Sequence, residues 1–489
     1  MSTPDDNEYR QARLAKLERL REAGVNPYPE RYERTCMLAR ARELDDGTEG
    51  VRVAGRVMTA RVMGKLSFLT LQDQSGRMQV SVRQDDVGKE DYKVIKKLLD
   101  IGDFLGIHGD VYTTRTGEKT VAARDFTFLG KTLRPLPEKW HGISDKESCY
   151  RQRYLDLLMN RETMDRFLLR SRLIRTMRSL LEAEGFIEVE TPVLQTKASG
   201  AAARPFKSHH NALDMPIYLR IAPETWLKRC IVGGFDKVFE FARCFRNEGM
   251  DPSHLQDFTM LEYYCAYWNY EDNMAFTEKL IQTVLRDLFG TLELEIQGET
   301  IDFGGTWPRV TFREMILEDC GIDIDAHETA DALREAILAQ GIQLEDADRL
   351  GRGNLIDHLY KAVSRPKLKA PTFITKHPID LSPLARRNDD NPRVADRFQL
   401  VVNGWEVVNA YSELVDPIDQ RRRLEEQSQL KSGGDEEAME MDEDYLLAME
   451  HGMPPISGWG MGIDRFCALI TNQPNLRDVV LFPLMKPVE

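Results

Sequence analysis

The feature that most constrains the fold of this chain is a switch to a two-residue hydrophobic period at position 51. Alternating apolar and polar residues predict strands in VRVAGRV (51–57), SFLTLQD (67–73) and RMQVSV (77–82). A helical segment follows at 88–100, and two more strands fit within 104–130. Three strands, one helix and two strands is the order of an OB-fold barrel, so we expect this barrel over residues 51–134.

A barrel of this type commonly binds single-stranded nucleic acid on one face, where bases stack on aromatic side chains. Phe68 is the candidate stacking platform, and Arg61, Gln79 and Glu118 are candidate polar contacts. Many small barrels bury a phenylalanine in the core, so a structural role for Phe68 is the alternative.

Residues 1–50 are interpreted as a helical extension ahead of the barrel, with a helix over 7–23. Leu14, Leu17 and Leu20 recur at three-residue spacing, and Gly24 suits the end of the helix. Five basic residues bias its surface, namely Arg10, Arg13, Lys16, Arg19 and Arg21. Their spacing favours an ordinary solvated face over an arm that binds nucleic acid.

A proline-interrupted linker is expected at 135–150, followed by a second domain over 151–489. An amphipathic helix at 165–185 leads into a strand at 186–194, and that strand stops at Pro192. Further alternating segments occur at 217–222, 237–243, 257–264 and 398–412. Because they lack regular βαβ spacing, we expect an antiparallel sheet flanked by helices and an α+β fold overall.

The charge of the chain is unevenly distributed. Its net charge is −14, but residues 1–150 hold 26 Lys and Arg against 24 Asp and Glu, which gives +2, and the remainder holds 40 against 56. This balance argues against a protein that coats nucleic acid nonspecifically. It is compatible with a polyanion held by the front of the chain and a cation or metal bound by the back.

Several observations predict a cytoplasmic protein without a membrane segment. The seven cysteines are odd in number and form no CxxC pair, which suggests reduced thiols. No apolar run is long enough to span a bilayer, and the charged N-terminus lacks the apolar region of a signal peptide.

The second domain contains three segments whose side chains are suited to ligand binding or catalysis. FARCFRNEGMDPSHLQDFTMLEYY (241–264) combines Arg246, Glu248, His254, Phe258 and Glu262. GWGMGIDRF (458–466) is expected to be a glycine-rich turn before a helix, where Arg465 can reach an anion or a base. A tight packed turn without any ligand is at least as plausible from these residues alone.

The third segment, WEVVNAYSELVDP (405–417), is an apolar strand that carries carboxylates. Alternation places Asn409, Tyr411 and Glu413 on one face, so Glu406 lies on the other face unless a bulge intervenes. Half-buried carboxylates need partners, either a structural salt bridge or a bound ammonium or magnesium ion. No nucleophile set stands out, which suits phosphorus chemistry that runs on positioning and charge neutralisation.

Taken together, these motifs resemble those of the class II lysyl-tRNA synthetases over nearly the whole chain. GFIEVETPVLQ (185–195), FARCFRNEG (241–249) and GWGMGIDRF resemble the three class II motifs in order. The segments RYLDL, GAAARPF, HHNALD, YLRIAPE, LSPLARRND and NAYSEL resemble the lysine subfamily.

The resemblance implies lysine–tRNA ligase activity in two steps, with ATP, L-lysine and tRNA(Lys) as substrates, Mg²⁺ as cofactor and a homodimer as the assembly. It implies that Arg246, Glu248 and Arg465 are catalytic, and that ATP is bound by Arg246, Glu248, His254, Phe258, Glu406 and Arg465. It implies that lysine is bound by Gly200, Glu224, Arg246, Glu262, Tyr264, Asn409 and Glu413. Glu406 and Gln399 match metal-ligand positions, and Arg61, Phe68, Gln79 and Glu118 match positions that bind the anticodon.

This chain departs from the family pattern at a few of these positions. Gln399 replaces a glutamate that is a metal ligand in the family, and Leu255 replaces an asparagine in the loop after the second motif. These two residues motivate an alternative, a synthetase-like protein that binds lysine, ATP or tRNA without charging. Lysine transfer to a protein acceptor fits poorly, because the anticodon-type barrel is present.

Overall fold

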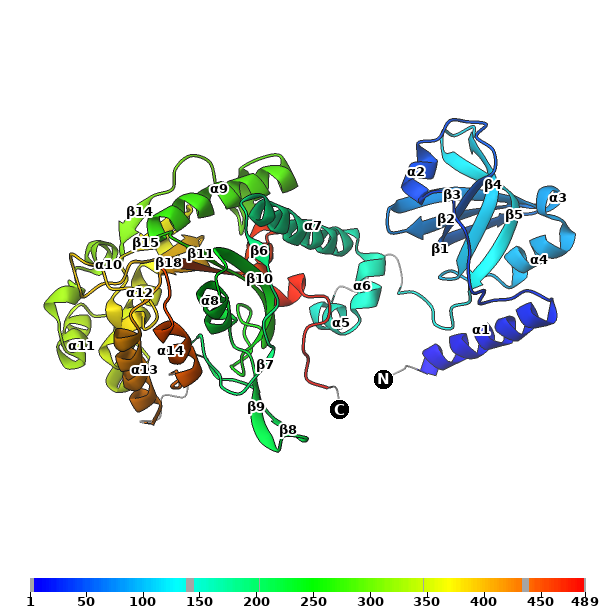
Figure 1. Cartoon of the computed structure of the whole chain (residues 1–489). Coiled ribbons are helices and arrows are strands. Elements are labelled where there is room, and N and C mark those ends of the chain that lie inside the picture. Colours follow the sequence, from blue (N-terminus) through cyan, green and yellow to red (C-terminus); the bar gives the residue numbers. More distant parts are fainter. Residues whose placement is uncertain (1–3, 138–144, 202, 346, 433–438, 488–489) are drawn as a thin grey trace. The chain divides into compact units, whose positions relative to one another are not determined.

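The computed structural model describes residues 4–137, 145–201, 203–345, 347–432 and 439–487 (Figure 1). The chain forms two compact units, Met1–Ser144 and Asp145–Glu489. The middle of the expected linker, residues 138–144, lies outside the described part of the chain.

The first unit contains the expected barrel, and the predicted OB-fold order of elements is confirmed. Its strands are β1 (Val51–Met63), β2 (Leu66–Asp73), β3 (Gly76–Arg83), β4 (Phe104–Thr113) and β5 (Lys119–Gly130). They close in the order β1-β2-β3-β5-β4, with α3 (Gln84–Val87) and α4 (Lys89–Lys97) between β3 and β4. Alternate residues such as Val53, Leu69, Val80, Ile107 and Val121 point inward and form its core.

Helices α1 (Pro4–Glu22) and α2 (Leu38–Arg42) complete this unit. Arg13 of α1 is buried and donates a hydrogen bond of 2.6 Å to the hydroxyl of Thr132, while Lys16 forms an ion pair with Asp100 at 2.6 Å. Two of the five basic residues of α1 therefore hold the helix to its own unit. This contact supports the structural interpretation of its charge.

The second unit is built on an eight-stranded sheet with the order β14-β15-β16-β17-β18-β11-β10-β6. The strands are β6 (Ile187–Glu188), β10 (Lys237–Phe245), β11 (Asp257–Ala266), β14 (Arg309–Thr311), β15 (Thr372–Thr375), β16 (Arg397–Val402), β17 (Trp405–Ser412) and β18 (Ile456–Gly462). Pairing is antiparallel except at the two ends, where β14–β15 and β10–β6 are parallel. The predicted α+β class is confirmed, as a mixed sheet with an antiparallel centre.

Two smaller sheets lie outside the large one. One pairs β7 (Leu194–Gln195), β9 (Met215–Leu219) and β8 (Lys207–His210), and the other pairs β12 (Glu293–Ile296) with β13 (Glu299–Asp302). The short 3-10 turns are η1 (Ile324–Ala326), η2 (Ala347–Arg349), η3 (Arg365–Lys367), η4 (Ile379–Leu381) and η5 (Leu476–Val479).

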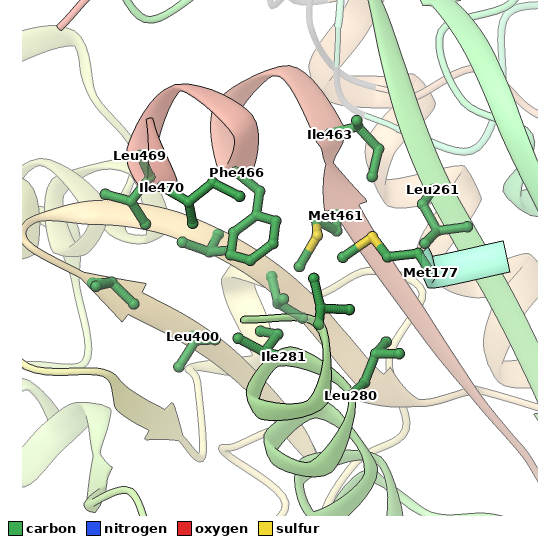
Figure 2. Close-up of a cluster of buried hydrophobic side chains, with 14 of the residues drawn as sticks. Met177, Leu261, Leu280, Ile281, Leu400, Met461, Ile463, Phe466, Leu469 and Ile470 are labelled. Atoms are coloured by element: carbon green, nitrogen blue, oxygen red, sulfur yellow. The ribbon is translucent and has the colours of Figure 1, made fainter. Parts of the chain in front are cut away.

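One face of the large sheet is covered by α7 (Arg161–Ala183), α9 (Tyr270–Phe289) and α15 (Ile463–Ile470). Figure 2 shows this core, where Ile281 of α9 and Phe466 of α15 meet Leu400 and Met461 of the sheet. The other helices are α5 (Lys146–Arg151), α6 (Arg153–Met159), α8 (Glu224–Val232), α10 (Phe312–Cys320), α11 (Ala330–Ala339), α12 (Arg352–Val363), α13 (Pro417–Ser432) and α14 (Glu443–Glu450). Within the described ranges, no helix has the length and apolar character needed to cross a membrane.

The expected strand at 186–194 is wrong, because only its two ends, β6 and β7, are in strand pairing. Between them, the hydroxyl of Thr191 donates 2.6 Å to Glu240, and Arg220 donates 3.1 Å to the Thr191 carbonyl. These side-chain contacts and Pro192, which has no N–H, replace the hydrogen bonds of a sheet ladder.

The expected glycine-rich turn at 458–462 is also wrong, because these residues form β18. Gly458 is required there by its neighbours rather than by a turn. A Cβ on Gly458 would lie 2.1 Å from Glu413 Oε1 and 2.5 Å from Tyr264 Cε1. The side chains of Tyr264 and Glu413 therefore occupy the space that a side chain at position 458 would need.

Candidate active site

A cavity of about 420 Å³ lies on the face of the large sheet opposite the α7–α9–α15 core. Arg397, Asn409 and Tyr411 line this cavity, while their neighbours Phe398 and Leu400 point into the core. Eleven of the predicted site residues line it, namely Gly200, Glu224, Arg246, Glu248, His254, Phe258, Glu262, Tyr264, Glu406, Asn409 and Arg465. Glu413 and Gln399 are not among its lining residues.

The β10–β11 hairpin supplies the centre of the cavity. Arg246 follows β10 directly, and its guanidinium carbon lies 5.1 Å from the centre of the Phe258 ring on β11. The backbone N–H of Arg246 donates 2.8 Å to the carbonyl of Gln256, which fixes the strand exit. Arg246 Nε is buried without a hydrogen-bond partner in the described part of the chain. A cation in this position is available to an anionic ligand.

The loop that follows is organised by Asp251. Its Oδ1 accepts from the backbone N–H of Ser253 at 2.6 Å, and its Oδ2 lies 2.7 Å from His254 Nδ1. Partial burial acts against ionisation of Asp251, but the Ser253 hydrogen bonds keep its pKa below the usual value. Leu255 is partly buried, packs against the core of the unit and also lines the cavity. The departure from the family pattern at Leu255 is thus accommodated by apolar packing.

A β-bulge brings Glu406 to the cavity. Leu400 pairs with Val408, but Val401 pairs with Glu406, so β17 has one extra residue at this point. The alternation along β17 therefore changes phase, and Glu406 shares the cavity with Asn409 and Tyr411. The bulge settles the alternative that the sequence left open for Glu406.

Three guanidinium groups line the cavity without a carboxylate within ion-pair distance among the described residues: Arg246, Arg397 and Arg465. Arg465 Nη1 donates 3.0 Å to the backbone carbonyl of Glu406, and Arg397 Nη1 donates 2.6 Å to that of Leu381. Burial lowers the pKa values of Arg397 and Arg465 from their usual values. Cations held by neutral acceptors suit a polyanion such as a triphosphate.

Carboxylates occupy a neighbouring part of the cavity. Glu224, the first residue of α8, and Glu262 of β11 are 7% and 6% exposed. The hydroxyl of Tyr411 donates a hydrogen bond of 2.9 Å to Glu224 Oε1, and the hydroxyl of Tyr264 donates one of 3.3 Å to Glu262 Oε2. Burial, and then the charge of Glu224, raise the pKa of Glu262 well above its usual value. Two buried acidic side chains in one cavity favour a cationic ligand.

Gly200 lies against this acidic region with a left-handed φ of +90°. A Cβ on Gly200 would lie 3.2 Å from the Cβ of Glu224, so the absence of a side chain permits the close approach. The backbone of Gly200 therefore forms part of the wall beside Glu224.

Glu413 lies behind the cavity wall, although the resemblance implied direct contact with lysine. Its side chain is 1% exposed, and Oε2 lies 2.5 Å from the ammonium of Lys228. Burial raises the pKa of Glu413 above its usual value, and the Lys228 ammonium opposes this rise.

The two predicted metal-ligand positions differ in their access to the cavity. Glu406 lines it, whereas Gln399 is 8% exposed and its Oε1 has no partner in the described ranges. The same residues contain no group of three His, Cys, Asp or Glu that could hold a metal ion. Any metal at Glu406 must therefore obtain most of its ligands from a substrate or from water.

The candidate contacts of the barrel share its outer surface. Arg61 pairs with Phe68, and Phe68 pairs with Ser81, so these side chains project on one face. Gln79 belongs to the same face, and its side-chain amide donates a hydrogen bond of 2.9 Å to the hydroxyl of Thr120. Phe68 is half-buried rather than part of the inner core. Glu118, exposed in the turn before β5, lies 3.9 Å from Arg42.

The sequence interpretation missed three residues of these two sites, Tyr112, Lys228 and Arg397, and it placed Tyr411 beside Asn409 without giving it a role. Tyr112 shares the outer face of the barrel, and its hydroxyl donates 3.1 Å to Ser81. Alternation of β4 and β5 could have revealed Tyr112, and alternation of the 398–412 hairpin could have revealed Arg397 and Tyr411. Lys228 gave no such signal, because its second partner, Glu413, is distant in the sequence.

Comparison with known proteins identifies the families to which both units are similar. The family model "tRNA synthetases class II (D, K and N)" matches residues 145–486, and that of the "OB-fold nucleic acid binding domain" matches residues 51–129. The chain therefore belongs to the class II tRNA synthetases, in the group that comprises the D, K and N enzymes.

Full-length relatives narrow this class. The lysine–tRNA ligase of Pelotomaculum thermopropionicum is 48% identical over 489 residues, which cover 99% of this chain and 96% of that protein. The corresponding ligase of Moorella thermoacetica is 47% identical over 491 residues, with 100% of both chains covered. That of Thermotoga maritima is 44% identical over 488 residues, covering 98% and 96%. Within its class, the chain belongs to the lysine–tRNA ligase family.

Proposed function

We propose that this chain activates L-lysine with ATP and transfers it to tRNA(Lys). The observation that carries this proposal is the division of charge in one cavity. The guanidinium groups of Arg246, Arg397 and Arg465, which form no ion pair with a described residue, lie in the same cavity as the buried carboxyl groups of Glu224 and Glu262. A nucleoside triphosphate needs the first set, and an amino acid with two ammonium groups needs the second.

ATP is held along the β10–β11 hairpin and the start of α15. Phe258 offers a ring face to the adenine, with Arg465 on the other side of the base and close to the terminal phosphates. Glu248 accepts a hydrogen bond from the adenine amino group, and His254 lies near the phosphates. Support comes from the shared cavity and from the Arg246 guanidinium, 5.1 Å from the Phe258 ring.

In the first step, a carboxylate oxygen of lysine attacks the α-phosphorus of ATP and pyrophosphate leaves. Arg246 neutralises charge that develops on the α-phosphate and also contacts the lysine carboxylate. Asn409 donates to the same carboxylate. The carboxylate is already ionised, so no protein general base is needed, and rate acceleration depends on orientation and charge. In the second step, a hydroxyl of the terminal ribose of tRNA attacks the carbonyl carbon of the lysyl-adenylate, the bond to the phosphate breaks and AMP leaves.

Mg²⁺ fits this site as an ion that arrives with ATP. Glu406 lines the cavity and supplies one carboxylate, and Gln399 has an unpartnered oxygen nearby on the paired strand. Magnesium in nucleotide sites commonly uses one or two carboxylates together with phosphate oxygens and water. When bound, it neutralises phosphate charge.

Lysine is selected at the acidic part of the cavity. Glu224 and the carbonyl of Gly200 accept from the α-ammonium, and Glu262 with Tyr264 meet the ε-ammonium. An amino acid without the second ammonium leaves Glu262 without its ionic partner, and discrimination of about 10⁴-fold is attainable in such cases. Glu413 contributes through Lys228, as argued below.

The barrel binds the anticodon of tRNA(Lys). Phe68 provides a stacking surface, while Arg61, Gln79 and Glu118 contact base edges or phosphates. Support comes from the common outer face of Arg61, Phe68 and Gln79, and from the match to a nucleic-acid-binding domain family. We place the activity in the cytoplasm, where tRNA is charged.

A homodimer is part of this proposal. Exposed apolar side chains gather at the first motif, with Ile187 at 52%, Val193 at 38% and Leu194 at 54% exposure. Such residues are normally covered, and a second copy of this chain is the occupant we propose. Sedimentation equilibrium is expected to give twice the chain mass, with dissociation by Leu194→Asp. A monomer at micromolar concentration would contradict this assembly.

The decisive experiment is ATP–pyrophosphate exchange with the purified protein and each of the amino acids. We expect exchange that depends on lysine and on millimolar Mg²⁺, followed by charging of tRNA(Lys). Exchange that needs no amino acid, or that depends only on an amino acid other than lysine, would refute the proposal. Lysine or tRNA binding without charging would instead support the alternative of a synthetase-like binding protein. The apolar packing of Leu255 against the core favours the enzyme over that alternative.

A further inference from the structure

The second unit contains a buried ammonium group that the reaction described above does not use. Lys228 lies in the second turn of α8, and its side chain is fully buried. Its Nζ is 2.6 Å from Glu224 Oε1 and 2.5 Å from Glu413 Oε2. Two carboxylates from distant parts of the chain thus meet on one nitrogen.

Aromatic rings surround the rest of this ammonium. Its Nζ lies 5.8 Å from the ring centre of Tyr264, 5.8 Å from that of Tyr411 and 5.7 Å from that of Tyr445. These rings come from β11, β17 and α14. Ring faces attract a cation and exclude water, which strengthens the two ion pairs.

The contacts of Glu224 show what this arrangement achieves. Glu224 Oε1 accepts from Lys228 and also from the Tyr411 hydroxyl at 2.9 Å. No hydrogen bond to Glu224 Oε2 occurs in the described part of the chain, although Glu224 lines the cavity. One oxygen is therefore held by the protein while the other remains for a ligand.

We propose that Lys228 is a positioning residue of the lysine-binding site, which anchors Glu224 through one oxygen and directs the other toward the substrate ammonium. Glu413 acts one contact further away, as the counter-charge that keeps Lys228 in place. This inference rests on the proposed function, because it assigns lysine as the ligand of Glu224.

Charge balance explains why a lysine-binding site contains a resident lysine. Without Lys228, Glu224, Glu262 and Glu413 would form a buried group of three acids, and like charges favour protonation. A protonated Glu224 presents no full charge to the ligand. The pKa of Lys228 is raised well above its usual value, since Glu224 and Glu413 outweigh the effect of its burial, so the ammonium persists at neutral pH.

The test uses the full-length protein and three variants. Lys228→Met removes the charge but keeps the length, Glu413→Gln removes the counter-charge, and the double variant removes both and restores neutrality. Lysine affinity is measured by calorimetry without ATP, and KM for lysine and ATP by exchange. Lys237→Met is the control, because Lys237 Nζ bonds the Glu184 carbonyl at 2.9 Å and Lys237 does not line the cavity.

We expect Lys228→Met to weaken lysine binding by about tenfold or more, as loss of a charged hydrogen bond to Glu224 predicts, with KM for ATP changed by less than about twofold. The double variant is expected to regain thermal stability but not lysine affinity. Its lysine affinity should also improve with pH over a higher range than in the wild type, because Glu224 loses the nearby cation while Tyr264, Tyr411 and Tyr445 remain neutral.

The outcomes separate the inference from the function on which it rests. If the wild type binds no lysine, the proposed function and this inference both fail. If the wild type binds lysine and the double variant binds it equally well with an unchanged pH profile, only the inference fails. Lys228 would then serve only to neutralise Glu413. Should Lys228→Met alone not fold, the double variant still decides between these results.

Discussion

The Nε of Arg397 donates a hydrogen bond of 2.9 Å to the side-chain oxygen of Asn409 on the adjacent strand. This contact fixes which end of the Asn409 amide faces outward. With its oxygen engaged, Asn409 offers only N–H donors to the cavity, and donors suit a carboxylate rather than an ammonium. Arg397 therefore orients a ligand-binding group while remaining without a carboxylate of its own in the described part of the chain.

Asn409→Asp is expected to raise KM for lysine by about tenfold or more, because a new carboxylate would pair with Arg397 and repel the substrate carboxylate. Asn409→Ser is the comparison, since it removes the amide without adding charge. The serine variant should be less impaired in lysine-dependent exchange. Equal impairment would show that the orientation of the amide is unimportant.

Arg246→Ala is expected to reduce ATP–pyrophosphate exchange by at least about 10²-fold, as loss of a group that stabilises transition-state charge typically does. Circular dichroism should be unchanged, because Arg246 forms no ion pair in the described ranges whose loss would affect folding. Arg313→Ala is the control, since its exposed guanidinium pairs with Asp323 at 2.5 Å, away from the cavity. Exchange near the wild-type rate would reject the role of Arg246.

Lysine affinity is expected to rise with pH at values above those at which an ordinary glutamate ionises. Burial and Glu224 raise the pKa of Glu262 in the free protein, so its carboxyl keeps a proton at pH values where an ordinary glutamate is ionised. A bound ammonium favours the ionised form, so binding releases a proton and becomes easier as pH increases. Calorimetry in buffers of different ionisation enthalpy counts this proton. Glu262→Gln should abolish the release, and release that persists in this variant would identify another group.

Phe68→Ala is expected to weaken tRNA charging while leaving amino-acid activation intact. Loss of one base–aromatic stack corresponds to about 1–3 kcal/mol in tRNA affinity. Exchange should not change, since every residue that lines the catalytic cavity belongs to the second unit. The two assays are run on one preparation, with thermal unfolding as the control. Parallel loss of both activities would favour a structural role for Phe68.

The barrel was predictable because its evidence is local. Period-two runs separated by short turns specify β1 to β5, and side-chain alternation alone places Phe68 and Gln79 on one face. The strand order of the second unit is harder to predict from the sequence. Its eight-stranded sheet joins strands from across the whole unit, so its order depends on contacts that no short window contains.

The failures in the site have the same origin. Gly458 was taken for part of a turn, because the residues that require a glycine, Tyr264 and Glu413, are far away in the sequence. The ion pair of Glu413 with the buried Lys228 could not be recognised from spacing, because the two residues are far apart in the sequence. The family resemblance named eleven of the residues that line the cavity, whereas the contacts between those residues required coordinates.

The bulge at Glu406 has a consequence for anyone who edits this hairpin. Successive side chains of a strand point to opposite faces of the sheet. A shift by an even number of residues therefore keeps a side chain on its face, and a shift by an odd number moves it to the other face. One extra residue of β17, between Glu406 and Val408, is what turns Glu406 into the cavity. Deleting a single residue there would leave the motif letters almost untouched and yet turn the carboxylate away. Residue count, as well as residue identity, is thus part of what a motif at this position must conserve in any redesigned or recombined chain.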